Sequence, residues 1–150
     1  RGVNMDENEV VPLSRSLLDA WLVKHEFRSQ QSSDNRCLLS FSYSEDADCE
    51  LEYSIVVHEG EDAFLSVRGW SDKKFRSTDR PSLLEVINEY HDSYRWPLIR
   101  IREQGRRINM DTSLDVDLSA GVSFTLFDDI LSGFLDNTYS FWIYISKQDV

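Results

Sequence analysis

The pattern that most constrains the fold is a β-hairpin in the second half of the chain. Apolar and polar side chains alternate over residues 99–102 and again over residues 108–116. Gly105-Arg106 stands between the two segments and fits a two-residue turn. With that turn Arg100 lies opposite Asp111, and an exposed pair of this kind adds about 0.2–1 kcal/mol. The alternation predicts two antiparallel strands with one buried face.

Three earlier strands are predicted at residues 36–44, 51–59 and 62–70. The turn between the last two decides which face of these strands is buried, and residues 59–62 fit a tight turn around Gly60. With two residues in the turn, the expected core face consists of Leu39, Phe41, Ser54, Val56, Leu65 and Val67. A slip of one residue in either turn would exchange the two faces.

The opposite face of these three strands is expected to be unusually apolar. It would carry Leu38, Tyr53, Ile55, Val57, Phe64, Arg68 and Trp70. A face of this composition is too apolar for simple contact with water. Either a helix covers it or it binds a partner.

Two helices are predicted before the hairpin of residues 99–116. Ser14 can cap the first, which ends near Phe27, and residues 29–35 form a polar loop. Pro81 fits the first turn of the second helix. That helix must end before Trp96-Pro97, because the residue before a proline disfavours α geometry.

A third helix is predicted from about Ser119 to Lys147, capped by Asp117 or Ser119. Gly133 and Asn137 could kink or split it. Its final turns contain more apolar surface than one core-facing stripe uses: Phe141, Trp142, Ile143, Tyr144 and Ile145.

These elements define an α+β fold in the order α-β-β-β-α-β-β-α, with an antiparallel sheet packed against helices. The 150 residues and 41% hydrophobic content fit one domain at residues 13–150. Residues 1–12 read as a flexible acidic leader.

No cluster of reactive side chains has the spacing of a catalytic or metal site, so we expect no enzyme, cofactor or metal. Residues 111–117 lack the spacing of a calcium loop, and their aspartates share one solvated strand face. Asp128 and Asp129 are adjacent on a helix and are expected on its exposed surface. His25, His58 and His91 stand on three different elements.

Cys37 and Cys49 are expected to be free thiols. Their strand positions place them more than about 15 Å apart, whereas a disulfide needs Cα atoms within about 7 Å.

The net charge of −11 argues against nucleic acid as a partner. The basic side chains that do gather are Arg95, Arg100, Arg102, Arg106 and Arg107, which we expect to pair with neighbouring carboxylates. No apolar run reaches the roughly 18 residues of a membrane span. The expected location is the cytoplasm, without membrane contact.

Residues 83–122 carry a family resemblance. The helix reads Leu83-Leu84-x-x-Ile87-Asn88-x-Tyr90-His91, and Trp96-Pro97, Gly105 and Asp117-x-x-x-Gly121-Val122 follow it. This resembles the YbjN family of small bacterial proteins, which are labelled as regulators of sensory transduction and share the fold of type III secretion chaperones. The family helix has two asparagines, and here Asn88 matches the first while His91 stands at the second. The resemblance implies a structural role for Asn88, as a cap or in a hydrogen bond to the neighbouring loop.

The resemblance also implies a non-enzymatic, protein-binding regulator of the chaperone or adaptor kind, with a homodimer or another protein as partner. The expected contact residues are Tyr53, Ile55, Phe64, Trp70, Phe141, Trp142 and Tyr144. The alternative is a small-ligand sensor with a pocket between sheet and helices, gated by Arg95 and Trp96.

Overall fold

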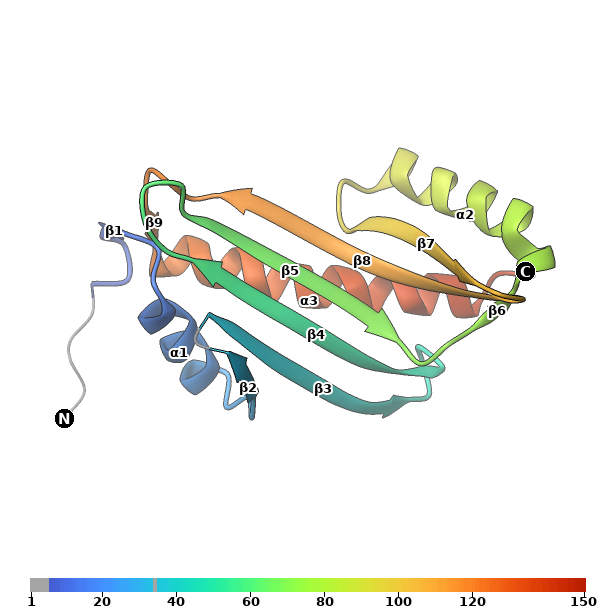
Figure 1. The fold of residues 1–150 in the computed structure, drawn as a ribbon, viewed down its shortest axis with the longest axis horizontal. Coiled ribbons are helices and arrows are strands. Elements are labelled where there is room, and N and C mark those ends of the chain that lie inside the picture. Colours follow the sequence, from blue (N-terminus) through green and yellow to red (C-terminus); the bar gives the residue numbers. More distant parts are fainter. Residues whose placement is uncertain (1–5, 34) are drawn as a thin grey trace.

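The expected order of long elements is confirmed in a computed structural model, which describes residues 6–33 and 35–150 (Figure 1). The long elements are α1 (Arg15–Lys24), β3 (Arg36–Ser44), β4 (Cys49–His58), β5 (Phe64–Ser71), α2 (Arg80–Ser93), β7 (Leu98–Gln104), β8 (Arg107–Asp117) and α3 (Phe124–Ser146). The short ones are β1 (Val10–Val11), β2 (Gln30–Ser33), β6 (Phe75–Arg76), the 3-10 turn η1 (Ser77–Asp79) and β9 (Val122–Ser123).

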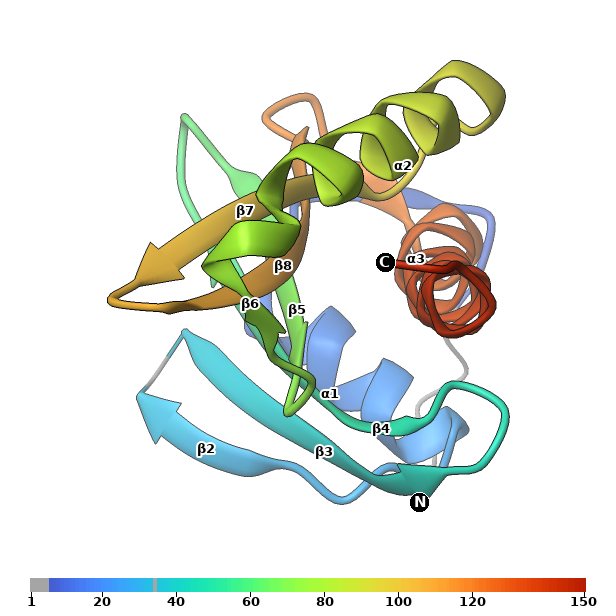
Figure 2. The same ribbon diagram turned by 90° about the vertical axis from the view of Figure 1, so that its right-hand side faces the viewer.

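The large sheet is antiparallel, with strands in the order β2-β3-β4-β5-β8, and β7 and β6 also pair with β8. The helices cover one face of this sheet: α3 runs along the strands, and α1 and α2 lie on either side of it (Figure 2). The other face, turned toward the viewer in Figure 1, carries no helix among the described residues. We call this helix-free side the open face.

The predicted hairpin of β7 and β8 is confirmed. Gln104 pairs with Arg107 around a two-residue turn, and Gly105 has a φ of +62°, which glycine adopts without strain. Arg100 lies opposite Asp111 as expected. The inward side chains of this hairpin, Ile99, Ile108 and Met110, are buried.

The predicted register between β4 and β5 is wrong by one residue. Val57 pairs with Leu65 and Ile55 with Val67, so the connection after the His58–Phe64 pair spans residues 59–63 and is not a two-residue turn. Because successive side chains of a strand point to opposite faces, this slip exchanges the two faces of β4.

The helix-covered face of β4 consequently carries Tyr53, Ile55 and Val57 in the core, where Ser54 and Val56 were expected. The inward positions of the neighbouring strands are as predicted: Leu39 pairs with Tyr53, and Leu65 and Val67 are fully buried. The core therefore forms between this face and α3.

Helix α3 begins later than predicted and is one continuous helix of 23 residues through Gly133 and Asn137. Its N-cap is Ser123, whose Oγ accepts a hydrogen bond from the Leu126 N–H at 3.1 Å. The helix cannot start near Ser119, because Val122 and Ser123 pair with β1 as strand β9. The Ser14 cap predicted for α1 is confirmed.

Strand β1 lies in the segment that reads as a flexible leader. Its Val10 and Val11 pair with β9, and the Glu7 carbonyl accepts a hydrogen bond from the Thr125 N–H at 2.9 Å. Residues 6–11 thus contact the fold, whereas residues 1–5 of the expected leader lie outside the described residues. The division of the chain at residue 12 stays a prediction.

Strand β2 replaces part of the loop predicted at residues 29–35. Gln30 pairs with Leu38 and Gln31 with Cys37, which makes β2 an edge of the sheet. Polar side chains do not prevent this pairing, since an edge strand is held by its backbone hydrogen bonds.

Candidate functional site

The open face carries large apolar side chains in the middle of its polar surface. The pairing of β5, β8 and β7 sets Arg68, Ser113 and Leu98 in one row and Trp70, Asp111 and Arg100 in the next. Leu98 is 56% exposed. We call Arg68, Trp70, Leu98 and Arg100 the open-face patch.

Arginine–aspartate pairs hold the polar groups of this patch. Arg68 donates two hydrogen bonds of 3.2 Å to the carboxylate of Asp115, and Arg100 donates one of 3.2 Å to Asp111, which also accepts from Arg102. The expectation that the arginine cluster pairs with carboxylates is confirmed for Arg100 and Arg102. Burial raises the pKa of Asp115, but hydrogen bonds from Ser66 and Arg68 outweigh it and lower that pKa below its usual value.

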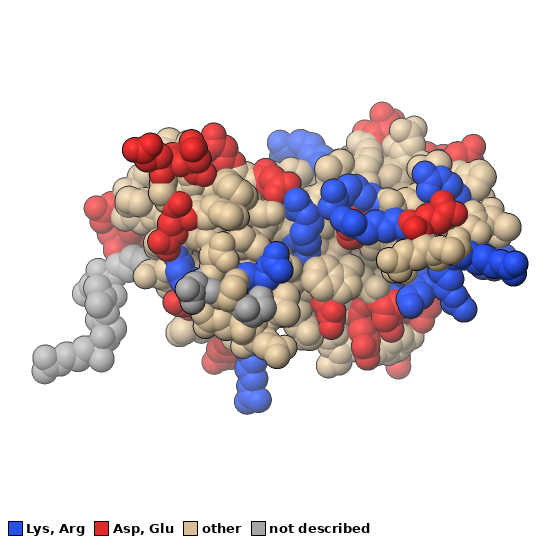
Figure 3. All heavy atoms as spheres, viewed as in Figure 1, with Lys and Arg blue, Asp and Glu red and all other residues tan. Residues whose placement is uncertain are grey.

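Two aromatic side chains predicted to bind a partner lie on this face. The Trp70 Nε1–H donates a hydrogen bond of 2.8 Å to Glu52, and Phe64 stacks on His58 with ring centroids 4.1 Å apart. Phe64 is 37% exposed and Trp70 is half-buried. Basic side chains gather on the same face over β7 and β8 (Figure 3).

Four of the seven predicted contact residues are buried, which contradicts a role in partner binding. Tyr53, Ile55, Phe141 and Trp142 are each at most 2% exposed. Tyr53 reaches α3, where its hydroxyl forms a 2.5 Å hydrogen bond with Thr138, and burial raises its pKa to about 12. Tyr53 and Ile55 face the core because the register of β4 differs by one residue from the predicted one.

The C-terminal aromatic residues of α3 are buried because α2 covers that end of the helix. The Tyr90 ring of α2 lies 5.1 Å from Phe141 and 5.5 Å from Tyr144. Helix α3 therefore packs on two sides, against the sheet and against α2, and uses more apolar surface than a single stripe. Tyr144 remains half-buried.

The family-like motif residues fix the loop between α2 and β7. His91 Nε2 accepts a hydrogen bond from the Ile99 N–H at 3.2 Å, and the Tyr90 hydroxyl donates to the Trp96 carbonyl at 3.3 Å. The Trp96-Pro97 peptide is cis. Asn88 is exposed on α2, and within residues 6–33 and 35–150 its side chain makes no hydrogen bond, against the structural role expected for it.

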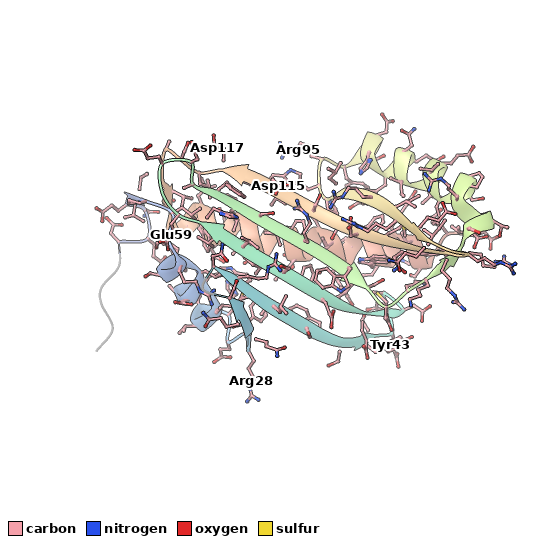
Figure 4. The ribbon with its side chains drawn as sticks, in the orientation of Figure 1. Arg28, Tyr43, Glu59, Arg95, Asp115 and Asp117 are labelled. Carbon is pink, nitrogen blue, oxygen red and sulfur yellow. The ribbon has the colours of Figure 1, made fainter. Side chains whose placement is uncertain are left out.

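A cleft between sheet and helices exists, but not at the predicted gate. Its volume is about 680 Å³, and its lining comes from the end of α1, from β3 and β4, and from α3. Neither Arg95 nor Trp96 lines it. Figure 4 shows Arg95 near β8, whereas Tyr43 lies at the far end of β3, the strand that contributes Phe41 to the cleft lining.

Asp128 was expected on an exposed helix surface and instead joins α3 to α1. Its carboxylate is 15% exposed and accepts hydrogen bonds from Trp21 at 3.0 Å, Lys24 at 2.8 Å and Ser132 at 2.8 Å, and contacts His25 Nε2 at 2.6 Å. Burial raises the pKa of this carboxyl, but the bonds from Lys24, His25 and Ser132 outweigh it and hold the pKa well below its usual value.

Both cysteines are free and buried. Burial raises the pKa of each thiol to about 11, so both are protonated at neutral pH.

The sheet, its one covered face and the order of its helices define a YbjN-like class of α+β fold. The crystal structure of YbjN from E. coli, described as a proposed transcription regulator, matches this chain with a TM-score of 0.64 at 11% sequence identity, over 92% of this chain and 94% of that chain. The resemblance predicted from residues 83–122 is confirmed at the level of the fold.

No family model matches the sequence, and no curated protein does. Within the described part of the chain, every helix is too short or too polar to cross a bilayer.

Proposed function

We propose that this chain is a non-enzymatic regulatory module that binds an acidic, partly apolar protein segment on the open-face patch. The observation that carries the proposal is the exposed Leu98 between Arg68 and Arg100 on a sheet face without a helix. Apolar contact surrounded by arginine is the composition that protein interfaces favour. The fold shared with YbjN, which is itself described as a proposed regulator, supports the regulatory part.

The charge pattern of the patch favours an acidic partner. Arg68, Arg100 and Arg102 of the open face share the two carboxylates of Asp111 and Asp115, so this group of side chains has one excess positive charge on a chain with a net charge of −11. Opposite charge on the partner would speed association and select against basic segments.

Fluorescence anisotropy with two labelled peptides tests this proposal. One peptide alternates Glu with Leu and the other alternates Lys with Leu. We expect the acidic peptide alone to bind, and the variant Leu98→Asp to weaken its binding by roughly tenfold or more, because it places a charge at the centre of the apolar contact. Val23→Asp is the matched control, since Val23 is 78% exposed on α1. Equal binding of both peptides, or no effect of Leu98→Asp, contradicts the proposal.

A homodimer is also part of the proposal, as a regulator of this size gains a second binding surface by self-association. Native mass spectrometry of freshly purified, untreated protein is expected to show the dimer. A monomer at every concentration would contradict the homodimer. The binding of a partner segment would then be tested by the peptide experiment alone.

A further inference from the structure

The cleft beside α3 lies on the covered side of the sheet, away from the open-face patch. Its volume of about 680 Å³ is within the range of roughly 300–1,000 Å³ typical of small-molecule sites. It lies between the C-terminal part of β3, the first part of β4 and the middle of α3. The short helix α1 ends at Lys24, so it covers only part of the sheet beside α3.

The body of the cleft is apolar and aromatic. The Phe41 ring stands edge-on to Phe27 and to Tyr53, with centroids 5.7 Å apart in each pair. Leu135 of α3 adds an aliphatic wall. Aromatic side chains present a large apolar surface and pack offset or edge-on against other rings.

The floor of the cleft is nearly closed. Cys49, Leu51 and Tyr53 line it, yet each is at most 6% exposed. The raised pKa keeps the Cys49 thiol uncharged at neutral pH, so it acts as an apolar group here. A recess whose floor is formed by buried side chains suits a small molecule better than a helix or strand of a partner protein.

Polar groups stand at both ends. His25 and Ser132 line one end, and at the other the hydroxyls of Ser44 and Tyr139 are 2.8 Å apart. Ser132 and Tyr139 are seven residues apart on α3, which corresponds to about 10 Å along the helix. This length matches a molecule of two or three fused or linked rings.

A charged side chain at the exposed side of the cleft determines which polar group a ligand can carry there. Asp136 lines the cleft and is exposed, and no ion pair involves it within the described ranges. A carboxylate beside an apolar recess repels anions and accepts hydrogen bonds from donors.

We propose that this cleft binds a small, flat, mostly apolar molecule that carries an amine or another hydrogen-bond donor and no negative charge. The apolar body lies between Phe41 and Leu135, and the donor faces Asp136. This site is separate from the open-face patch, so either can exist without the other.

The neutral arylamine dye N-phenyl-1-naphthylamine is the probe, because its fluorescence rises in an apolar site. We expect saturable binding of one dye per chain. Leu135→Trp should weaken it by roughly tenfold or more, since the larger side chain fills the space that the dye needs. Leu126→Trp is the matched control: the same change on the same helix, at a residue that is 49% exposed and does not line the cleft. Circular dichroism verifies that both variants fold.

A second dye tests whether the cleft discriminates against negative charge. The probe 8-anilinonaphthalene-1-sulfonate keeps the arylamine body and adds a sulfonate, and we expect it to bind the native protein more weakly than the neutral dye. Asp136→Asn changes only an exposed side chain, so it leaves the fold intact, and it should bring the two affinities closer together. Equal affinities in the native protein, or neutral-dye binding that Leu135→Trp leaves unchanged, would overturn the proposal.

Discussion

At the scale of single residues, Asp128 leads to a stability prediction. The replacement Asp128→Asn keeps the shape of the side chain but removes the charge that Lys24, His25 and Ser132 contact. Hydrogen bonds to a charged group contribute more than neutral ones, so the free energy of unfolding at pH 7 should fall by about 1–3 kcal/mol. Urea denaturation followed by tryptophan fluorescence measures the change.

The pH dependence of that loss follows from the lowered pKa of Asp128. A carboxyl whose pKa is lower in the folded state stabilises the protein at pH values above its unfolded pKa, which is about 3.9 for aspartate. This stabilisation is lost as the pH falls from there toward the folded pKa. The difference between the native protein and Asp128→Asn should therefore shrink below about pH 4. The neighbouring Asp129→Asn is the control, because Asp129 is exposed and should change stability by less than about 0.5 kcal/mol. A constant difference from pH 7 to pH 3 would contradict this account.

At the scale of elements, the sequence predicted what depends on local pattern. The Ser14 cap, the place of Pro81 in the first turn of α2 and the two-residue turn at Gly105 were predicted from neighbouring residues and are correct. The buried face of β4 was predicted wrongly, because it depends on the length of the loop between β4 and β5, and several turn types can close that loop.

The same uncertainty in loop length affected the prediction of the candidate site. Tyr53 and Ile55 were placed on the exposed side through the register alone, whereas Phe64 and Trp70 do lie on the open face. The start of α3 depended on the pairing of β9 with β1, a contact more than a hundred residues apart in sequence, which periodicity does not reveal. The Asp128 contacts likewise join two distant helices.

Two glycines give an element-scale prediction for α3 and β5. Gly133 lies inside α3, and a Cβ there would have nothing within 4 Å, so Gly133→Ala should stabilise the protein by roughly 0.5–1 kcal/mol through helix propensity. Gly69 of β5 is the contrasting site, because a Cβ there would meet Thr112 Oγ1 at 2.7 Å and Tyr53 Cε1 at 2.8 Å. Gly69→Ala should destabilise by about 1–3 kcal/mol. Thermal unfolding compares the two, and a loss of stability in Gly133→Ala would show that α3 is not continuous there.

At the scale of the whole molecule, the charge distribution bears on the proposed protein-binding function. The net charge of this chain is −11, and Arg68, Arg100 and Arg102 are already paired with aspartates. A protein binds duplex DNA largely by neutralising phosphates with unpaired cations. These three arginines are therefore not free to neutralise phosphates.

We therefore expect no binding to duplex DNA at physiological salt. A gel-shift titration with a mixed-sequence duplex at about 150 mM salt should show no complex, since weak non-specific binding of any kind falls steeply with ionic strength. Asp111→Asn and Asp115→Asn together release the paired arginines of the open face, and this double variant should bind DNA more tightly than the native protein at low salt. A native complex that persists at 150 mM salt would instead make the arginines of β7 and β8 a nucleic-acid surface, and the acidic peptide would then compete with DNA for it.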